Sequence, residues 1–200
     1  MVDNYWEQLR GAAFRYAEYG WPVVPGGRPT RPRRDGWPVP QDTMAPYQGS
    51  MSPNDIARYW QHHPHPVLLR TGPYGLDVFR LNEPLATSLL HQLTNRGQRG
   101  PVAVLPNRQW LFLVTADNPP PEELRRRTIH YHGPDNWIPA PPTRIRNTAV
   151  AWHITPTSVG WQLFEPRTFR NILGELLPKR RTTQTRAAQE NGTTRSAMIR

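Results

Sequence analysis

The chain has 200 residues, a length typical of one domain or at most two small ones. Its 24 prolines exclude a bundle of long helices, and the absence of cysteine excludes a disulfide scaffold, a cysteine-based zinc site and a thiol nucleophile. With 25 basic and 15 acidic residues, the formal charge is +10, which attracts polyanions such as nucleic acid. No apolar run approaches the ~20 residues of a membrane span, and the first residues do not resemble a signal peptide, so we expect a cytoplasmic protein without membrane contact.

The N-terminal third predicts two helices separated by a strand and a long loop. Apolar residues recur at helical spacing after Asp3 or Asn4 and stop before Gly20, and a short apolar strand follows over 21–24. Residues 25–50 are rich in proline and glycine, which predicts a loop that is either functional or disordered. That loop carries four arginines, Arg28, Arg31, Arg33 and Arg34. A second helix follows the loop, with Ser52 as its N-cap and Pro53 as its first residue.

The rest of the chain predicts strands and helices in alternation. Strands are expected at 66–70, 76–81, 101–105, 109–115, 128–140 and about 150–154, and helices at 83–95 and about 169–177. The predicted fold class is α+β, with a mixed or antiparallel sheet packed against helices. We expect one domain over 1–178, followed by a disordered basic tail over 179–200, because that segment has few apolar anchors. The tail begins with Lys179, Arg180 and Arg181.

Several short segments occur together in an order that resembles a known family. They are YGWPVVP at 19–25, the basic loop, a helix ending in YW at 59–60, LRTG leading to GLDV over 69–78, and WIPAPPT at 137–143. This order resembles the bacterial bifunctional DNA primase/polymerase domain, the prim-pol group of the archaeo-eukaryotic primase superfamily. The resemblance covers about residues 10–155 and implies a prim-pol fold. It also implies that the arginines of the loop meet template or nucleotide phosphates.

The positions that carry catalysis in the family hold other residues here. The resemblance implies two metal-binding aspartates on the strand after GLDV, and these positions fall on Arg80 and Asn82. The family's nucleotide-contacting histidine falls on Trp110, which the resemblance places in the catalytic cleft, and the third metal carboxylate falls near His130. Two-metal nucleotidyl transfer needs carboxylate ligands for magnesium, and an arginine puts a positive charge where a cation would bind.

These substitutions predict a degenerate prim-pol domain that has no catalytic residues, metal or other cofactor and that binds nucleic acid. Arg80 would line the former metal cleft and hold phosphate, together with the loop arginines and the basic residues of the tail. Single-stranded or primed DNA is the expected partner. One alternative is a regulatory subunit that binds a protein in the cleft. The other is an active primase/polymerase that uses Mg²⁺ or Mn²⁺ with another carboxylate set around Asp77.

Histidines recur in two parts of the chain and raise the question of a metal site. His62, His63 and His65 follow the second helix, and His130 and His132 would share one face of a strand. Zinc sites use three or four ligands at defined spacings, and no such spacing is present. The pattern therefore favours ordinary exposed or hydrogen-bonded histidines over a metal centre.

Overall fold

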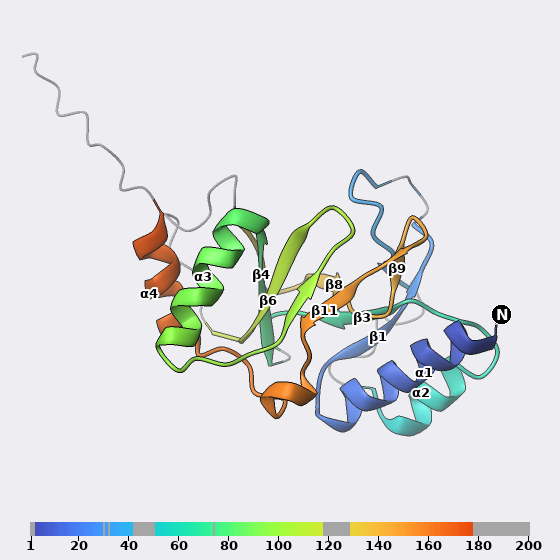
Figure 1. The fold of residues 1–200 in the computed structure, drawn as a ribbon. Coiled ribbons are helices and arrows are strands. Elements are labelled where there is room, and N and C mark those ends of the chain that lie inside the picture. Colours follow the sequence, from blue (N-terminus) through green and yellow to red (C-terminus); the bar gives the residue numbers. More distant parts are fainter. Residues whose placement is uncertain are drawn as a thin grey trace, which may run out of the picture.

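The computed structural model describes residues 3–29, 31, 33–41, 51–73, 75–117 and 129–177. Its strands form two main antiparallel sheets, one of four strands in the order β2-β1-β3-β8 and one of five in the order β11-β5-β6-β4-β7 (Figure 1). The first contains β1 (Val23–Gly27), β2 (Val39–Pro40), β3 (Val67–Arg70) and β8 (Trp137–Pro139). The second contains β4 (Leu76–Asn82), β5 (Val102–Val104), β6 (Gln109–Thr115), β7 (Ile129–His132) and β11 (Ala151–Ile154).

The helices lie on the outer sides of the two sheets. α1 (Asp3–Glu18) and α2 (Pro53–Tyr59) pack beside the four-stranded sheet, while α3 (Glu83–Asn95) and α4 (Pro166–Leu176) cover one face of the five-stranded sheet (Figure 1). A small hairpin of β9 (Arg144–Ile145) and β10 (Thr148–Ala149) and a 3-10 turn, η3 (Thr157–Val159), complete the described elements. This arrangement confirms the α+β prediction.

Two hydrophobic cores follow from the alternation of side chains along β4. Residues at even positions, such as Val78, join a core shared by both sheets with α1 and α2. Residues at odd positions, such as Phe79 and Leu81, join a second core with α3 and α4. Because side chains on a strand alternate between faces, both faces of the five-stranded sheet are buried along most of β4. An ionisable residue on either face of β4 therefore needs a specific partner.

Most helix boundaries follow the local signals in the sequence. The Ser52 side chain accepts a hydrogen bond from the Asp55 amide at 3.2 Å, as its predicted N-cap role requires. The helix predicted over 83–95 has those bounds. α4 begins earlier than predicted, at Pro166, because Glu165 caps it through the amides of Arg167 and Thr168.

The loop predicted over 25–50 is only partly a loop in the described residues. β1 extends to Gly27, and β2 pairs with it, Gly26 opposite Pro40 and Gly27 opposite Val39. Trp37, between these strands, is buried with 3% of its surface exposed. The prediction of a long unstructured segment was therefore wrong for 25–27 and 39–40, which form strands, and residues 42–50 lie outside the described part of the chain. The β9–β10 hairpin was not predicted.

α1 is tied to a segment that lies far along the chain. The Tyr16 hydroxyl donates a hydrogen bond to the Pro141 carbonyl at 2.5 Å, and the Trp152 indole donates to the Tyr16 oxygen at 3.1 Å. The Arg144 amide donates to the Tyr5 hydroxyl at 3.1 Å, near the other end of the helix. Residues 141–152 therefore hold α1 through polar contacts near both of its ends.

Candidate functional site

The five-stranded sheet brings two of the four predicted catalytic positions together on one face. Arg80 on β4 lies directly opposite His130 on β7, and Val78 lies opposite His132. Directly paired residues of antiparallel strands point to the same face, so Arg80, His130 and His132 share the face that turns toward the four-stranded sheet. The predicted common face of His130 and His132 is thus present.

The other two predicted positions make contacts outside this site. Asn82 stands at the end of β4, where its side chain accepts a hydrogen bond from the Leu85 amide at 3.2 Å and caps α3. Trp110 pairs with Leu81, not with Arg80, and lies in the core beneath α3 and α4. Its ring contacts that of His153, with 4.3 Å between centroids. The expectation that Trp110 faces the former metal site was therefore wrong by one residue of register; Gln109, opposite Asn82, is on the Arg80 face.

Trp37 fills the space beside Arg80. The guanidinium carbon of Arg80 lies 5.1 Å from the centroid of the Trp37 ring, a cation–π distance. The same indole stacks on the His132 ring, with 5.3 Å between centroids and 26° between planes. We call Arg33, Asp35, Trp37, Arg80 and His132 the Arg80 cluster. Sequence reasoning missed Trp37 because the tryptophan stands in a proline- and glycine-rich segment without strand or helix periodicity.

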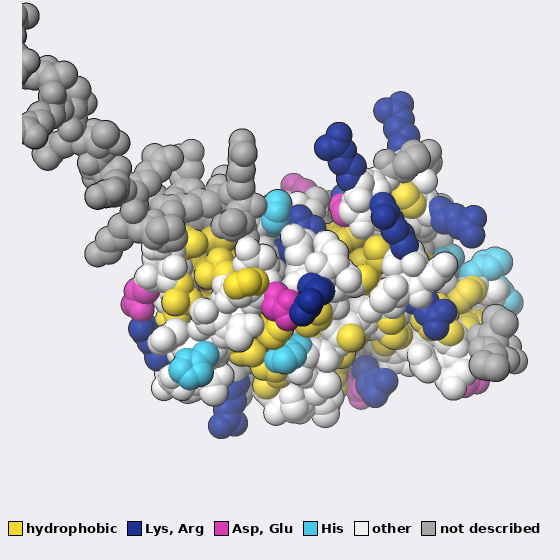
Figure 2. Space-filling view, turned by 45° about the horizontal axis from the view of Figure 1, so that its top comes forward, with side chains coloured by type: hydrophobic (Ala, Val, Ile, Leu, Met, Phe, Trp, Pro, Cys, Tyr) yellow, Lys and Arg dark blue, Asp and Glu magenta, His cyan; other side chains and the backbone are white. Residues whose placement is uncertain are grey.

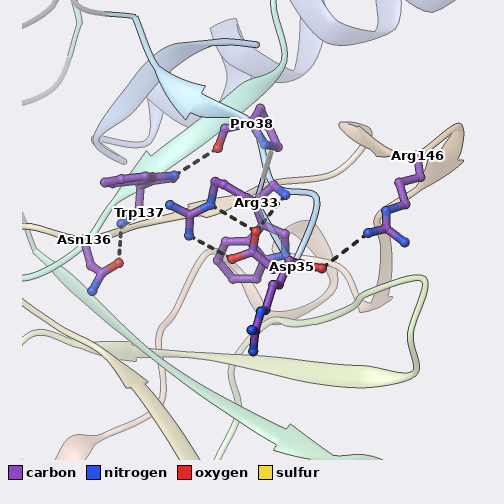
Figure 3. Close-up of polar contacts among 8 residues, drawn as sticks. Arg33, Asp35, Pro38, Asn136, Trp137 and Arg146 are labelled. Atoms are coloured by element: carbon purple, nitrogen blue, oxygen red, sulfur yellow. Dashed lines mark hydrogen bonds and ion pairs between the residues drawn. The ribbon is translucent and has the colours of Figure 1, made fainter. Parts of the chain in front are cut away.

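The segment that carries Trp37 is held in place by polar contacts, most of which Figure 3 shows. Arg33 donates from Nε and Nη2 to the two carboxylate oxygens of Asp35 at 3.0 and 2.8 Å, and Asp35 also accepts from the Trp37 amide at 3.0 Å. The Trp137 indole on β8 donates to the Pro38 carbonyl at 3.1 Å. These contacts tie residues 33–38 to the four-stranded sheet and fix Trp37 against Arg80.

The charges of the Arg80 cluster influence one another. Burial lowers the pKa of the Arg80 guanidinium from its ordinary value, and the negative charge of Asp35 partly offsets that effect. Burial raises the pKa of Asp35, but the hydrogen bonds from Arg33 and from the Trp37 amide outweigh it, so that the carboxyl has a lowered pKa. Asp35 is thus the anion that compensates two arginines, Arg33 directly and Arg80 at longer range.

His132 is the most strongly perturbed histidine of the described residues. Burial, together with the positive charge of Arg80, lowers the pKa of His132 to about 4, although the Asn136 side chain opposes this shift. Burial and the Arg80 charge also lower the pKa of His130. Both imidazoles are therefore neutral at pH 7. No group of three or more histidine, aspartate or glutamate side chains in the described ranges is arranged to hold a metal ion.

Asp77 lies on the opposite face of β4. It is 4% exposed and accepts hydrogen bonds from the Tyr131 hydroxyl at 2.8 Å and the Asp117 amide at 3.3 Å. Burial raises the pKa of Asp77, and the hydrogen bond from Tyr131 opposes the shift. Asp117 itself is paired with Arg170 of α4 at 2.6 Å. Asp77 and Arg80 therefore belong to different environments.

A second group of arginines lies at the surface next to this cluster. Arg28, Arg31 and Arg34 are exposed, whereas Arg33 is paired with Asp35. The β9–β10 hairpin adds Arg146, whose guanidinium donates to the Arg34 carbonyl at 3.4 Å (Figure 3). Figure 2 shows basic side chains projecting from this end of the molecule. The other predicted phosphate-binding residues, Lys179, Arg180 and Arg181, lie outside the described residues.

Comparison with known families identifies the fold that carries these residues. A sequence model described as bifunctional DNA primase/polymerase, N-terminal, matches residues 13–162. The chain belongs to this family. No curated protein matches the sequence. The prim-pol match confirms the predicted family and indicates a DNA primase/polymerase-like domain. None of the described helices has the length and apolar character needed to cross a bilayer.

Proposed function

We propose that this prim-pol domain binds nucleic acid and does not catalyse nucleotidyl transfer. The observation that carries the proposal is Arg80, which stands in the middle of β4 at the position that resembles the family's first metal-binding aspartate, with Trp37 packed against it. The fold is retained while the residues that would hold the metals are replaced. What remains is a basic surface on a rigid scaffold.

The residues at the metal positions do not fit magnesium. Mg²⁺ takes oxygen ligands in octahedral geometry, most often carboxylates. Arg80 repels a cation by about 4 kcal/mol per unit charge at ~4 Å with an effective dielectric constant of ~20. His130 offers a nitrogen rather than a carboxylate, and the Asn82 side chain is engaged as the cap of α3. We therefore derive no metal-dependent step for this chain.

Asp77 does not supply a replacement. Its carboxylate is on the face of β4 that α3 and α4 cover, and it accepts hydrogen bonds from Tyr131 and Asp117. An alternative carboxylate set would need at least two acidic side chains on the Arg80 face. Asp35 is the acidic residue whose charge reaches Arg80, and Arg33 already holds both of its oxygens.

The exposed arginines support phosphate binding. Arginine neutralises backbone phosphates and releases condensed counterions, which gives an affinity that does not depend on sequence and falls with salt. Within the described residues, Arg28, Arg31 and Arg34 form no ion pair with an acidic side chain, so their charge is available to a ligand. The net charge of +10 adds long-range attraction to the same partner.

Primer extension and DNA binding test the proposal in one set of samples. We expect no nucleotide incorporation on a primed template with Mg²⁺ or Mn²⁺, and salt-sensitive binding of the same template by fluorescence anisotropy. Replacing Arg28, Arg31 and Arg34 with alanine should lower the log–log salt slope by about two to three, because each lost phosphate contact removes about one. A matched control removes three exposed arginines on other elements, Arg15, Arg99 and Arg167.

Two results would contradict the proposal. Metal-dependent incorporation that survives repeated purification would show that the domain is catalytic, and its dependence on Asp77 could then be tested with Asp77→Asn. Absence of DNA binding at low salt would favour the other reading, a regulatory subunit whose partner is a protein.

A further inference from the structure

The β9–β10 hairpin places two arginines beside the arginine-rich segment that follows β1. Ile145 pairs with Thr148, so Arg146 and Asn147 form a two-residue turn at the tip. The Arg146 guanidinium reaches the Arg34 carbonyl, and a Cβ built on Gly36 would lie 3.1 Å from Arg146 Nε. The hairpin tip therefore lies directly against residues 34–36. Arg146 and Arg34 are nevertheless 112 residues apart in the sequence.

The residue at the tip is unfavourable for the backbone conformation. Arg146 has a φ of 48° and Asn147 a φ of 73°. Turns with both central residues at positive φ favour glycine, asparagine and aspartate, since a larger side chain is strained there. Such strain persists where the surrounding structure holds it and is concentrated at functional positions. An exposed arginine is therefore an unusual residue at this position.

The second hairpin arginine is held in position by an aromatic ring. The guanidinium carbon of Arg144 lies 4.3 Å from the centroid of the Tyr5 ring, and the Arg144 amide donates to the Tyr5 hydroxyl. Both arginines are exposed, and among the described residues neither forms an ion pair. Stacking on a ring restricts a guanidinium without neutralising it, so less conformational entropy is lost when it binds an anion.

We propose that Arg144 and Arg146 extend the loop arginines into one surface that binds the phosphate backbone of duplex nucleic acid. This inference rests on the proposed function and names its ligand. The arginine surface consists of Arg28, Arg31, Arg34, Arg144 and Arg146. It joins two elements that are distant in sequence, so its shape depends on the fold and not on one flexible segment.

Among the residues that the structure describes, the surface offers charge but no open aromatic ring, which favours a duplex over a single strand. Proteins that bind single strands without sequence preference stack bases on exposed aromatic side chains. Here the Tyr5 ring is covered by Arg144, and the Trp137 ring by Arg33 at 5.6 Å. Tyr19 is the one exposed large hydrophobic residue of the described ranges, and it lies about 21 Å along the helix axis from Tyr5. A purely electrostatic surface gains more from a duplex, because each phosphate contact contributes about 0.9 to the salt slope there and about 0.7 on a single strand.

Arg146→Asn separates the charge of the tip from its structural role. Asparagine fits a positive φ better than arginine, so this variant should unfold at the same or a higher temperature than the unmodified chain. Its affinity for a duplex should fall about eightfold at ~0.1 M salt, and its salt slope should fall by about 0.9. If Arg146 were needed only for its hydrogen bond to Arg34, the Arg146→Asn variant would instead unfold at a lower temperature than the unmodified chain.

The experiment compares the full chain, Arg146→Asn, the double variant with Arg144→Gln, and a control double variant with Arg99→Gln and Arg167→Gln. Each is titrated with a 20-base-pair duplex and with one of its strands at four salt concentrations. We expect tighter binding of the duplex, a loss of about 60-fold in the hairpin double variant at ~0.1 M salt, and little change in the control.

The outcomes separate this inference from the proposed function. If the full chain binds neither probe at low salt, both fail. If it binds DNA but prefers the single strand, or if the hairpin variants bind the duplex as the full chain does, this inference is overturned and the proposed function stands.

Discussion

β4 carries one ionisable residue on each of its faces, and the two are accommodated in opposite ways. Asp77, beneath α3 and α4, is stabilised by hydrogen bonds from Tyr131 and the Asp117 amide. Arg80, on the other face, packs against the Trp37 ring and receives only a longer-range charge interaction from Asp35. Two hydrogen bonds reach one oxygen of the Asp77 carboxylate, whereas the Arg80 guanidinium is supported by packing against a ring. The comparison teaches that Asp77 belongs to the architecture of the helix side, while Arg80 and Trp37 are packed together on the face that turns toward the four-stranded sheet.

Replacing Trp37 with alanine tests how firmly the Arg80 face is packed. Removal of a fully buried tryptophan leaves a cavity, so we expect a loss of about 3–5 kcal/mol of unfolding free energy, measured by urea denaturation. Phe79→Ala, which truncates a side chain 2% exposed on the other face of the same strand, should cost about as much. A cost below about 1 kcal/mol for Trp37→Ala alone would show that the Arg80 face is an open binding site rather than a packed one.

The pH dependence of stability tests the electrostatics of the same face. His132 has an ordinary pKa of 6.5 when unfolded and about 4 when folded, so the folded state favours its neutral form. The contribution of His132 to the unfolding free energy is therefore complete above pH 6.5. It falls by about 3 kcal/mol as the pH decreases toward 4. Arg80, His130 and Asp35 are the charged or titratable groups that act on it.

The measurement is the unfolding free energy of the full chain and of His132→Asn between pH 4 and 7.5. The variant should lose less stability over this range than the unmodified chain, because the residue that must become charged on unfolding is absent. Equal pH dependence of the two proteins would show that His132 is accessible to solvent in the folded state.

Tyr131→Phe tests the helix face and has the smallest expected effect. The change removes the hydroxyl that donates to the Asp77 carboxylate, and hydrogen bonds to charged groups contribute about 1.5–3 kcal/mol. The loss should be smaller in the background of Asp77→Asn, because a neutral amide needs the donor less. Additive effects of the two changes would mean that this hydrogen bond does not stabilise the fold.

The sequence predicted the elements well where local signals determine them. The cap at Ser52, the bounds of α3 and the hairpin of β5 and β6 follow from capping, periodicity and turn residues. The register of β6 against β4 was not available from those signals, and it puts Trp110, which the resemblance placed in the cleft, on the face of the sheet opposite Arg80.

The sequence did not predict the contacts between distant segments. The position of Trp37 depends on Arg80 and His132, which lie on two other strands, and no local pattern in residues 25–50 contains that information. The pairing of the β9–β10 hairpin with residues 34–36 is equally non-local. Arg146-Asn147 was a weak turn signal, because arginine is uncommon at positive φ.

The hydrogen bonds between α1 and residues 141–152 have a consequence for synthesis of the chain. Tyr16 emerges from the ribosome 136 residues before its partner Trp152. At a synthesis rate of ~5–20 residues per second, roughly 7–27 s pass between synthesis of the helix and synthesis of that strand. During this interval the aromatic face of α1 has no native partner from that segment, which makes the nascent helix a candidate for chaperone binding.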